Sequence, residues 1–556
     1  MNKIFKYRLS VIGYCLLVIG YWLIVSCADY NVTDGFKADP DPSFVEPYKD
    51  LDPVKSYINR EQYPNLTLGA MLNVSEFNKQ ELAHAAAVTN FDDLAFGTSL
   101  MSGAIINAKG VMNFLDMKDL LDHVEDIGGE VFGSPIVANA NQADGWLSTL
   151  TAPIEIIVDY VEGKTVDYTT MTTFEGTVEK GTAAIEKYDG ANALKISSAT
   201  SVRIIEGFEL DSSATYTTTF WAKADKDVNF SVVFSGTQID GGSAGGRFLL
   251  AAGNWKKIVV ESQSAPGETE GYLRIETARG TPVYIQKVQV GYYPDNHRPQ
   301  TAQEKSDTIN YALNAWCDGM MKINEGRIKK FDLIDEALGT DELDNGMYDL
   351  KHSTDKFFWQ DVLGSENYAP VVSKVASEAY QKYGGDPEAL RFFISESGLE
   401  NEKQFESLKY WVGIWDAKGA KIDGINAKLN LTYSEDAATQ EANKASLDNL
   451  LTNLANFAST TGKLIRLSNF DITYKNAEGA KVVAKDITDA QRQKLADYYG
   501  YVIKSYMSKI PNDKQAGICK GNLVDTNDPV GLWAVENKDW MRTATYKAFC
   551  EALSGQ

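Results

Sequence analysis

Two kinds of hydrophobic pattern alternate along most of the chain. Short apolar runs of β-capable residues are followed by longer stretches with apolar residues three and four positions apart. The stretch from 301 to 327, which includes Ala312 and Trp316, and the stretch from 437 to 461 show this spacing clearly. Spacings of three and four indicate a helix with one buried face, and short apolar runs bounded by turn residues indicate strands.

The repeated order of strand and helix predicts a parallel sheet with crossover helices. The pattern covers residues 65–151 and resumes over residues 294–556. Together the two stretches contain eight predicted strands. We therefore expect an α/β fold, a (β/α)8 TIM barrel, built from both stretches.

A different pattern interrupts this alternation at residues 152–293. Short runs there alternate apolar and polar residues and are separated by Gly, Ser, Asp and Asn, as in residues 216–224 and 230–234. A period of two indicates half-buried strands. We expect an all-β jelly-roll sandwich inserted after the third barrel strand, which a surface loop tolerates when the inserted termini lie close together.

The amino terminus has the pattern of an export signal. A basic start precedes an apolar run from Leu9 to Val25, and Cys27 follows it directly. This resembles a bacterial lipoprotein signal peptide over residues 1–27, with a lipid on Cys27, and places the protein at the cell surface on the outer membrane. An uncleaved signal anchor is the alternative. Residues 28–64 are rich in Asp and Pro, and we expect a solvated tether.

Composition narrows the classes of partner. The chain of 556 residues has 54 Lys and Arg against 76 Asp and Glu, a net charge of −22. Nucleic acid is an unsuitable partner because phosphate binding needs a basic surface, whereas a neutral glycan is not excluded. With only four His and no CxxC spacing among five Cys, the sequence predicts no metal site and no cofactor.

Two adjacent carboxylates follow the short predicted strand that begins at Phe331. Asp335 and Glu336 stand where a TIM barrel places catalytic groups, at the carboxyl end of a strand. The other interpretation is that they are ordinary loop acids in an acidic protein. The residues of this segment alone leave both interpretations open.

Short motifs across the predicted barrel carry a family resemblance. They are Gly69-Ala70, Asn90-Phe91, and five segments that each approximate a family pattern: residues 110–114 (GVMNF, against G-x-F-N-F), 331–338 (FDLIDEAL, against W-D-V-V-N-E-A-L), 422–425 (IDGI, against I-D-G-I-G), 465–472 (IRLSNFDI, against I-x-I-T-E-L-D-I) and 544–549 (ATYKAF, against a closing P-A-Y helix). On these segments the chain resembles glycoside hydrolase family 10, the retaining endo-β-1,4-xylanases. The resemblance implies two carboxylates about 5–5.5 Å apart, one as acid/base and one as nucleophile.

The region between the barrel halves carries a second resemblance. Its F-W-A-K stretch at Trp221 and its W-K-K stretch at Trp255 resemble carbohydrate-binding modules of the family 4/9 type. Insertion of such a module after the third barrel strand resembles xylan-utilisation lipoproteins of gut Bacteroidetes. The resemblance implies a polysaccharide or oligosaccharide as ligand, the membrane as a partner through the lipid, and a glycan transporter complex of the outer membrane as a further candidate partner.

The expected active site departs from the family. Glu336 stands at the acid/base position, but Asn469 occupies the nucleophile position, and an amide cannot form the glycosyl ester. The polar and aromatic positions that hold sugar in the family are also replaced, with Lys428 and Lys520 among the new residues. Asp335 and Asp471 remain candidates for a second carboxylate. Neighbouring strand residues point to opposite faces, however, and Asp471 needs a bulge to reach the nucleophile position.

These observations support a glycan-binding lipoprotein derived from a family 10 hydrolase, without catalysis, in the use of a xylan-like polysaccharide. Candidate sugar-stacking residues are Trp146 in the barrel and Trp221, Trp255 and Tyr293 in the sandwich, although Trp221, in mid-strand, favours core packing. The alternative is an active endo-1,4-β-xylanase or related O-glycosyl hydrolase that uses Glu336 and a relocated second carboxylate. A surface assembly protein that uses the barrel as a scaffold is the third hypothesis.

Overall fold

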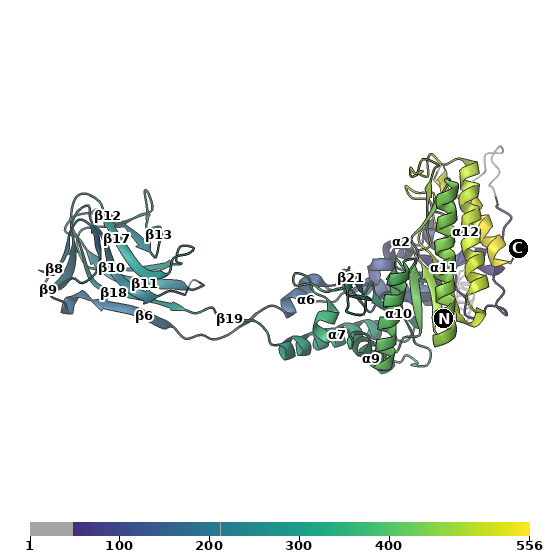
Figure 1. Cartoon of the computed structure of the whole chain (residues 1–556), viewed down its shortest axis with the longest axis horizontal. Coiled ribbons are helices and arrows are strands. Elements are labelled where there is room, and N and C mark those ends of the chain that lie inside the picture. The colour runs from purple at the N-terminus through teal and green to yellow at the C-terminus, as the bar shows by residue number, and fades with distance from the viewer. Residues whose placement is uncertain (1–47, 212, 537, 556) are drawn as a thin grey trace, which may run out of the picture. The chain divides into compact units, whose positions relative to one another are not determined.

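The computed structural model describes residues 48–211, 213–536 and 538–555, which divide into two compact units. One unit combines residues 48–151 with residues 302–555, and the other is residues 152–301 (Figure 1). The predicted signal peptide, the lipidation residue Cys27 and the first part of the expected tether lie outside the described residues.

Parallel strands close into a barrel in the first unit. Neighbours in the sheet follow the order β1, β2, β3, β20, β23, β24, β26, β28, and β28 pairs with β1 again. The short β4 continues β3 and pairs with the end of β20, so the barrel has eight strand positions. This confirms the predicted (β/α)8 barrel. The strands are β1 (Leu68–Met71), β2 (Asp93–Ala95), β3 (Glu130–Gly133), β4 (Val137–Ala138), β20 (Lys330–Asp335), β23 (Arg391–Ser397), β24 (Gly424–Lys428), β26 (Leu464–Ser468) and β28 (Gln515–Lys520).

Helices pack on the outside of the barrel through apolar faces. Trp316 of α7 is buried as its spacing predicts, and so are Trp411 and Trp415 of α10. The long α11 starts at Asp436, whose carboxylate accepts from the Thr439 N–H, and stops at Gly462, which has a φ of +74°. It runs beside α12 (Figure 1). The helices are α2 (Val74–Asn78), α3 (Leu82–Asn90), α4 (Ser102–Ile105), α5 (Leu115–Asp126), α6 (Asp144–Leu150), α7 (Ala302–Asn324), α8 (Trp359–Leu363), α9 (Tyr368–Lys382), α10 (Glu402–Ala417), α11 (Ala437–Thr461), α12 (Asp489–Lys509) and α13 (Ala544–Leu553).

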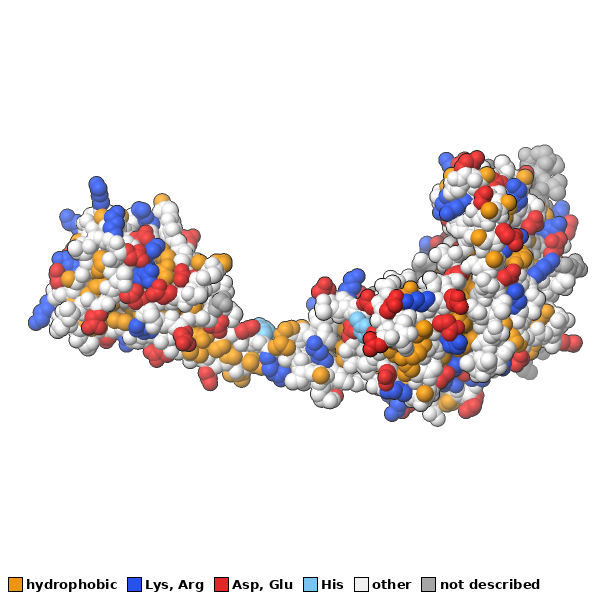
Figure 2. Space-filling view, viewed as in Figure 1, with side chains coloured by type: hydrophobic (Ala, Val, Ile, Leu, Met, Phe, Trp, Pro, Cys, Tyr) orange, Lys and Arg blue, Asp and Glu red, His pale blue; other side chains and the backbone are white. Residues whose placement is uncertain are grey.

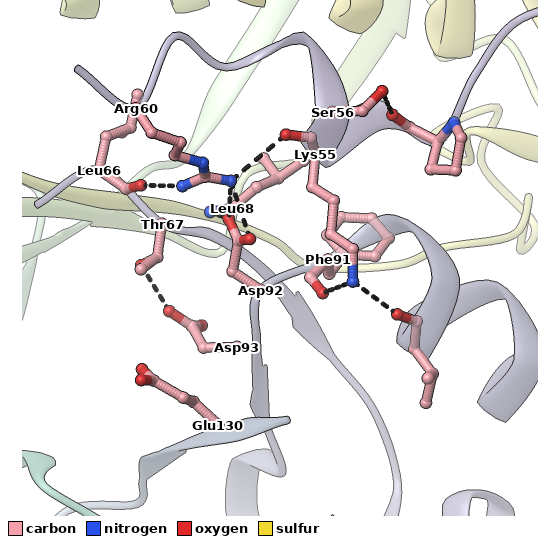
Figure 3. A network of polar contacts seen from close by, with 12 residues as sticks. Lys55, Ser56, Arg60, Leu66, Thr67, Leu68, Phe91, Asp92, Asp93 and Glu130 are labelled. Atoms are coloured by element: carbon pink, nitrogen blue, oxygen red, sulfur yellow. Dashed lines mark hydrogen bonds and ion pairs between the residues drawn. The ribbon is translucent and has the colours of Figure 1, made fainter. Parts of the chain in front are cut away.

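The segment before β1 packs on the barrel, which corrects the expected tether boundary. Val54 and Ile58 are buried, although residues up to 64 were expected to be solvated. Figure 3 shows the polar contacts that fasten this segment: Arg60 donates to both carboxylate oxygens of Asp92 at 2.8 and 2.9 Å, and Lys55 Nζ donates to the Phe91 carbonyl at 3.1 Å. The segment is rich in Asp and Pro overall, so its composition gave no sign that Val54 and Ile58 are buried.

The second unit consists of two antiparallel sheets around one core. Phe220 and Val288 of one sheet and Phe230 and Leu273 of the other belong to this core. One sheet contains β14 (Gly242–Ser243), β15 (Arg247–Leu250), β12 (Val228–Phe234), β17 (Glu270–Thr277), β10 (Ser201–Glu209) and β7 (Val178–Lys180), with β13 (Thr237–Ile239) paired to β12. The other contains β16 (Lys256–Ser262), β11 (Thr215–Lys223), β18 (Val283–Tyr293), β9 (Ala191–Ile196) and β8 (Ala183–Tyr188), with β6 (Val161–Asp167) paired to β18.

Two short strands extend this unit past the expected boundary at residue 293. β19 (His297–Arg298) pairs with β5 (Ile154–Glu155), so the unit continues to residue 301. Acidic and basic side chains intermingle on the visible face of the unit (Figure 2). Arg203 illustrates the arrangement, because its guanidinium contacts Glu179 at 3.1 Å and Glu270 at 2.8 Å. The sheets are antiparallel and share one core, and the jelly-roll type remains a prediction.

Candidate functional site

Two residues at the carboxyl ends of barrel strands have left-handed backbone. Glu336, directly after β20, has a φ of +54°, and Asn469, directly after β26, has a φ of +52°. Such a conformation is uncommon for residues other than Gly and is tolerated best by Asn and Asp. A positive φ ends the strand at this residue, so its side chain no longer follows the alternation of faces along the strand. The two positions expected, from the resemblance, to hold the acid/base and the nucleophile therefore share one backbone feature.

Lys428 contacts two adjacent carboxylates at the end of β20, those of Asp335 and Glu336. Its Nζ lies 2.5 Å from Asp335 Oδ1 and 3.3 Å from Glu336 Oε1. Strand alternation predicts that these neighbours point to opposite faces, and this expectation is wrong here. The left-handed φ of Glu336 breaks the alternation, so both carboxylates reach the same ammonium group.

The carboxylate of Glu336 is held in its ionised form. Burial raises the pKa of this group, but the charge of Lys428 and the hydroxyl of Ser397, which donates to Oε2 at 3.0 Å, outweigh burial and place the pKa below its usual range. A general acid for glycoside cleavage must instead retain its proton near neutral pH. Glu336 is thus unsuited to protonating a leaving group in this arrangement.

Glu396 is a site residue that the sequence reasoning missed. It lies near the end of β23 and is buried, and its Oε2 accepts from the Leu338 N–H at 3.2 Å. Burial and the neighbouring charge of Glu336 raise the pKa of Glu396 well above its usual range. Its position at the carboxyl end of a strand, like that of Glu336, is the signal that could have found it.

Asp471 is engaged by a second lysine. The ammonium of Lys520 forms an ion pair with Asp471 Oδ1, and Asn522 donates to Oδ2 through its side chain at 2.6 Å. Burial lowers the pKa of Lys520, opposed by the charge of Asp471. Asn469 donates instead to the Leu429 carbonyl at 3.2 Å. The structure thus brings Asp335 and Glu336 together at Lys428, and it pairs Asp471 with a different lysine.

A cavity of about 330 Å³ opens at this end of the barrel. Asp332 and Asn426 form part of its lining, and Asn426 Nδ2 donates to both oxygens of Asp332 at 3.0 Å. Burial, followed by the charge of Asp335, raises the pKa of Asp332 to about 7. The residues that line the cavity are Met71, Ala95, Phe96, Gly97, Thr98, Met101, Phe132, Gly133, Ser134, Pro135, Asn141, Asp332, Asp335, Asn426, Lys428, Arg466, Ser468, Asn469 and Cys519.

Among the described residues, no three His, Cys, Asp or Glu side chains gather in a way that could hold a metal ion. None of the helices described is both long and apolar enough to span a bilayer.

An aromatic face lies on the outer side of the second unit. Tyr188 stacks on Tyr284 with ring centroids 3.6 Å apart, and Trp255 meets Tyr188 edge-on at 6.1 Å. Trp221 pairs with Lys257, two residues beyond Trp255, so both indoles project from the same face of the sheet. We call Trp221, Trp255, Tyr188 and Tyr284 the aromatic face.

The four predicted stacking residues have different environments. Trp221 is 39% exposed, so the expectation of core packing is wrong for it, because Phe220 occupies the inward position beside it. Tyr293 is exposed but pairs with Thr215, six residues along β11 from Trp221 and roughly 20 Å away. Trp146 is buried in the barrel core, where its ring lacks an open face for a sugar.

Comparison with known proteins places the barrel in context. Residues 293–533 match the family model described as glycosyl hydrolase family 10. The match spans less than half of the 556 residues and includes β20 to β28. It therefore contains both left-handed positions, Glu336 and Asn469, together with Lys428 and Lys520. No curated protein matches the chain.

Solved xylanase structures resemble the chain in fold. The Penicillium canescens endo-1,4-beta-xylanase XylE is 12% identical with a TM-score of 0.51, over 91% of this chain and 98% of that one. Xylanase10C from Cellvibrio japonicus is 12% identical with a TM-score of 0.52, over 92% of this chain and 75% of that one. Xylanase B from Clostridium stercorarium F9 is 10% identical with a TM-score of 0.50, over 90% and 100%. Identities this low establish a shared fold only.

Proposed function

We propose that this protein is a glycan-binding lipoprotein of the cell surface that derives from a family 10 hydrolase and does not cleave its ligand. The ligand is a polysaccharide or oligosaccharide of the xylan type. The family 10 match, the xylanase fold and the lipoprotein-like signal around Cys27 support this assignment. An outer-membrane glycan transporter is the partner expected for such a protein.

The ion pair of Lys428 with Asp335 and Glu336 is the observation that carries the proposal. A retaining mechanism needs a protonated acid and a free carboxylate nucleophile on opposite sides of the scissile bond. Here Lys428 keeps Glu336 ionised, and Asn469 replaces the nucleophile. The remaining candidate, Asp471, is paired with Lys520. The groups required for double displacement are thus replaced or neutralised.

Glycan binding is assigned to the second unit, as an inserted carbohydrate-binding jelly roll. Its aromatic face provides flat apolar rings for the C–H faces of sugars, and polar groups lie beside them. Lys223 Nζ, for example, contacts Asp189 Oδ2 at 2.6 Å and lies 5.4 Å from the ring of Tyr188. An exposed indole, that of Trp221, and a partly exposed one, that of Trp255, next to such groups suit an extended neutral chain.

The test is calorimetric titration of the chain from residue 28 to residue 556 with a panel of plant and host polysaccharides. Released reducing ends are assayed in the same samples. We expect saturable heat with a xylan-type polymer and no reducing ends, in the parent and in Glu336→Gln alike. Absence of binding to every polymer refutes the assignment.

Active endo-1,4-β-xylanase is the second candidate, and one observation favours it: Glu336, which the resemblance expects to be the acid/base, directly follows β20 at the carboxyl end of the strand. Reducing ends released by the parent and abolished by Glu336→Gln establish this candidate. That result means that a second carboxylate has replaced the function lost at Asn469.

A further inference from the structure

Trp221, the most exposed ring of the aromatic face, has a lysine as its neighbour on β16. Its partner in the register of the two strands is Lys257. Partners in an antiparallel pair share a face of the sheet, and their Cβ atoms lie about 4.5 to 5.5 Å apart. Lys257 is exposed. One side of the open indole is therefore lined by an ammonium group on a flexible stem.

A bulge in β18 places a second lysine on the other side of Trp221. Val288 and Ile285 of β18 pair with the two residues that flank Trp221 in β11. The two residues between them, Gln286 and Lys287, therefore oppose a single residue. Val288 and Ile285 are fully buried, so the side chains between them lie on the outer side of the sheet. Lys287 is exposed there.

The charges of these two lysines are not neutralised by the fold. Among the described residues, neither Lys257 nor Lys287 has an ion pair or a hydrogen bond at its ammonium group. Lys223, two residues from Trp221 on the same face, is by contrast paired with Asp189 at 2.6 Å. The two unpaired lysines come from the strands on either side of β11, about 10 Å apart at the backbone.

Carboxylates of the same face have other partners or lie farther along the sheet. Asp167, which opposes Lys287 on β6, accepts from the N–H of Thr169 at 3.0 Å and from its hydroxyl at 2.6 Å. Glu261 lies four residues along β16 from Lys257, roughly 13 Å away. The open indole thus has positive charge on both sides, in a chain whose net charge is −22.

We propose that the aromatic face recognises a glycan with carboxylate side groups, a xylan-type chain substituted with uronic acid. The neutral main chain lies on the rings, and a side-group carboxylate accepts charge-assisted hydrogen bonds from Lys257 and Lys287. This assignment rests on the proposed glycan function, because it concerns the same face, and it adds the chemical class of the substituent.

The experiment compares glucuronoxylan with its carboxyl-reduced form, in which each uronic acid has become a neutral sugar. Both are titrated calorimetrically into the chain from residue 28 to residue 556. We expect both to bind, with glucuronoxylan about fivefold tighter, since two solvent-exposed charge contacts are worth about 1 kcal/mol. The preference shrinks between ionic strengths of about 0.01 M and 0.1 M, where the Debye length falls from about 30 Å to about 10 Å.

Matched double variants locate the charges. Lys257→Gln with Lys287→Gln removes the preference, so that the two polymers bind equally, while binding of the carboxyl-reduced polymer is unchanged. The control is Lys256→Gln with Lys180→Gln, which removes the same net charge from exposed positions elsewhere on the unit. Lys256 pairs with the inward-facing Ala222, and Lys180 belongs to the other sheet. We expect this control to keep the preference.

The possible failures separate the two proposals. Equal affinity of the parent protein for both polymers overturns the uronic acid assignment and leaves the glycan function standing. A preference that survives Lys257→Gln with Lys287→Gln, or that the control variant abolishes equally, overturns the assignment to these two lysines. Binding of neither polymer refutes the glycan function and the assignment together. Thermal unfolding confirms that each variant folds, as expected for exposed side chains.

Discussion

The barrel end and the aromatic face of the second unit present their binding groups in opposite ways. At the barrel end, Glu336 and Asp471 are each paired with a lysine from the same chain. On the aromatic face, Trp221 remains 39% exposed and carries a ring that a ligand can cover. The fold thus supplies partners for the carboxylates of the barrel end, whereas the Trp221 ring remains open to a ligand. The proposed glycan site is therefore best tested on the aromatic face.

The largest expected effect comes from breaking the lysine pairs. Lys428→Met removes the largest influence that lowers the pKa of Glu336, so burial, which raises this pKa, is less well offset. In the parent, the lowered pKa of Glu336 stabilises the fold above pH 4.5 and the contribution is lost as pH falls. In the variant this contribution is smaller, so the loss is largest where Glu336 is ionised. We expect a loss of about 3 kcal/mol at pH 8 and a smaller loss at pH 5.

Chemical denaturation at both pH values measures this difference. Lys409→Met is the matched control, because Lys409 pairs with Glu406 on the exposed surface, and we expect less than about 0.5 kcal/mol there. Equal losses at pH 5 and pH 8 for Lys428→Met contradict the interpretation of Glu336 as an anion held by Lys428.

The second effect concerns the aromatic face. The double variant Trp221→Ala and Trp255→Ala removes two stacking rings, and we expect about 2 to 3 kcal/mol of lost polysaccharide affinity, or roughly 30- to 150-fold. Calorimetric titration measures it. Tyr293→Ala is the control, since Tyr293 is exposed but lies at the other end of β11. If Tyr293→Ala alone abolishes binding, the binding face has been assigned to the wrong end of the sheet.

A third effect tests whether the barrel end lacks only a nucleophile. Asn469→Glu places a carboxylate where the resemblance expects the nucleophile, yet we expect no release of reducing ends because Lys428 still favours the ionised form of Glu336. Stability falls by about 1 kcal/mol, because Glu is less tolerant of a left-handed φ than Asn. Asn469→Gly controls for the loss of the amide without backbone strain. Hydrolysis by Asn469→Glu alone shows that the lysine pairs do not prevent catalysis.

The smallest effect concerns His352, which lies between two other carboxylates, Asp349 and Asp361. His352 contacts Asp361 through Nδ1 and lies 3.6 Å from Asp349 through Nε2. Burial lowers its pKa, but the two carboxylates outweigh burial and raise the pKa above 6.5. The charged imidazole therefore stabilises the fold at low pH, and the contribution is lost as pH rises through the raised pKa.

His352→Gln should remove this dependence. Solvent screening of the partly exposed group limits the change to about 0.5 kcal/mol, measured as a flatter profile of unfolding free energy between pH 6 and pH 9. His297→Gln, in the other unit, is the control for loss of a histidine. An unchanged profile in His352→Gln means that the two carboxylates do not stabilise the imidazolium.

Hydrophobic periodicity along the chain predicted the barrel well. It could not predict which lysines pair with Glu336 and Asp471. The helix expected over residues 437–461 has those bounds in the structure, because helical spacing is a local signal. Lys428 and Lys520 were visible in the sequence only as replacements of family residues. That their ammonium groups reach Glu336 and Asp471 depends on strands paired across long sequence separations.

The direction of side chains along a strand was the second feature that the sequence could not predict. Phe220 and Trp221 are adjacent aromatics in one strand, so only one of them can face the core. The sequence does not say which, and the register of β11 between β16 and β18 decides it. Tyr188 and Tyr284 join the aromatic face for the same reason, from strands far apart in the sequence.

The two left-handed corners hold different amounts of backbone strain. Asn tolerates a φ of +52° well, whereas Glu at +54° is strained. Stability commonly increases when a strained residue is exchanged for one that suits its backbone. Exchange of Glu336 for Gly therefore relieves backbone strain at one corner, and it removes the carboxylate that Lys428 contacts at 3.3 Å.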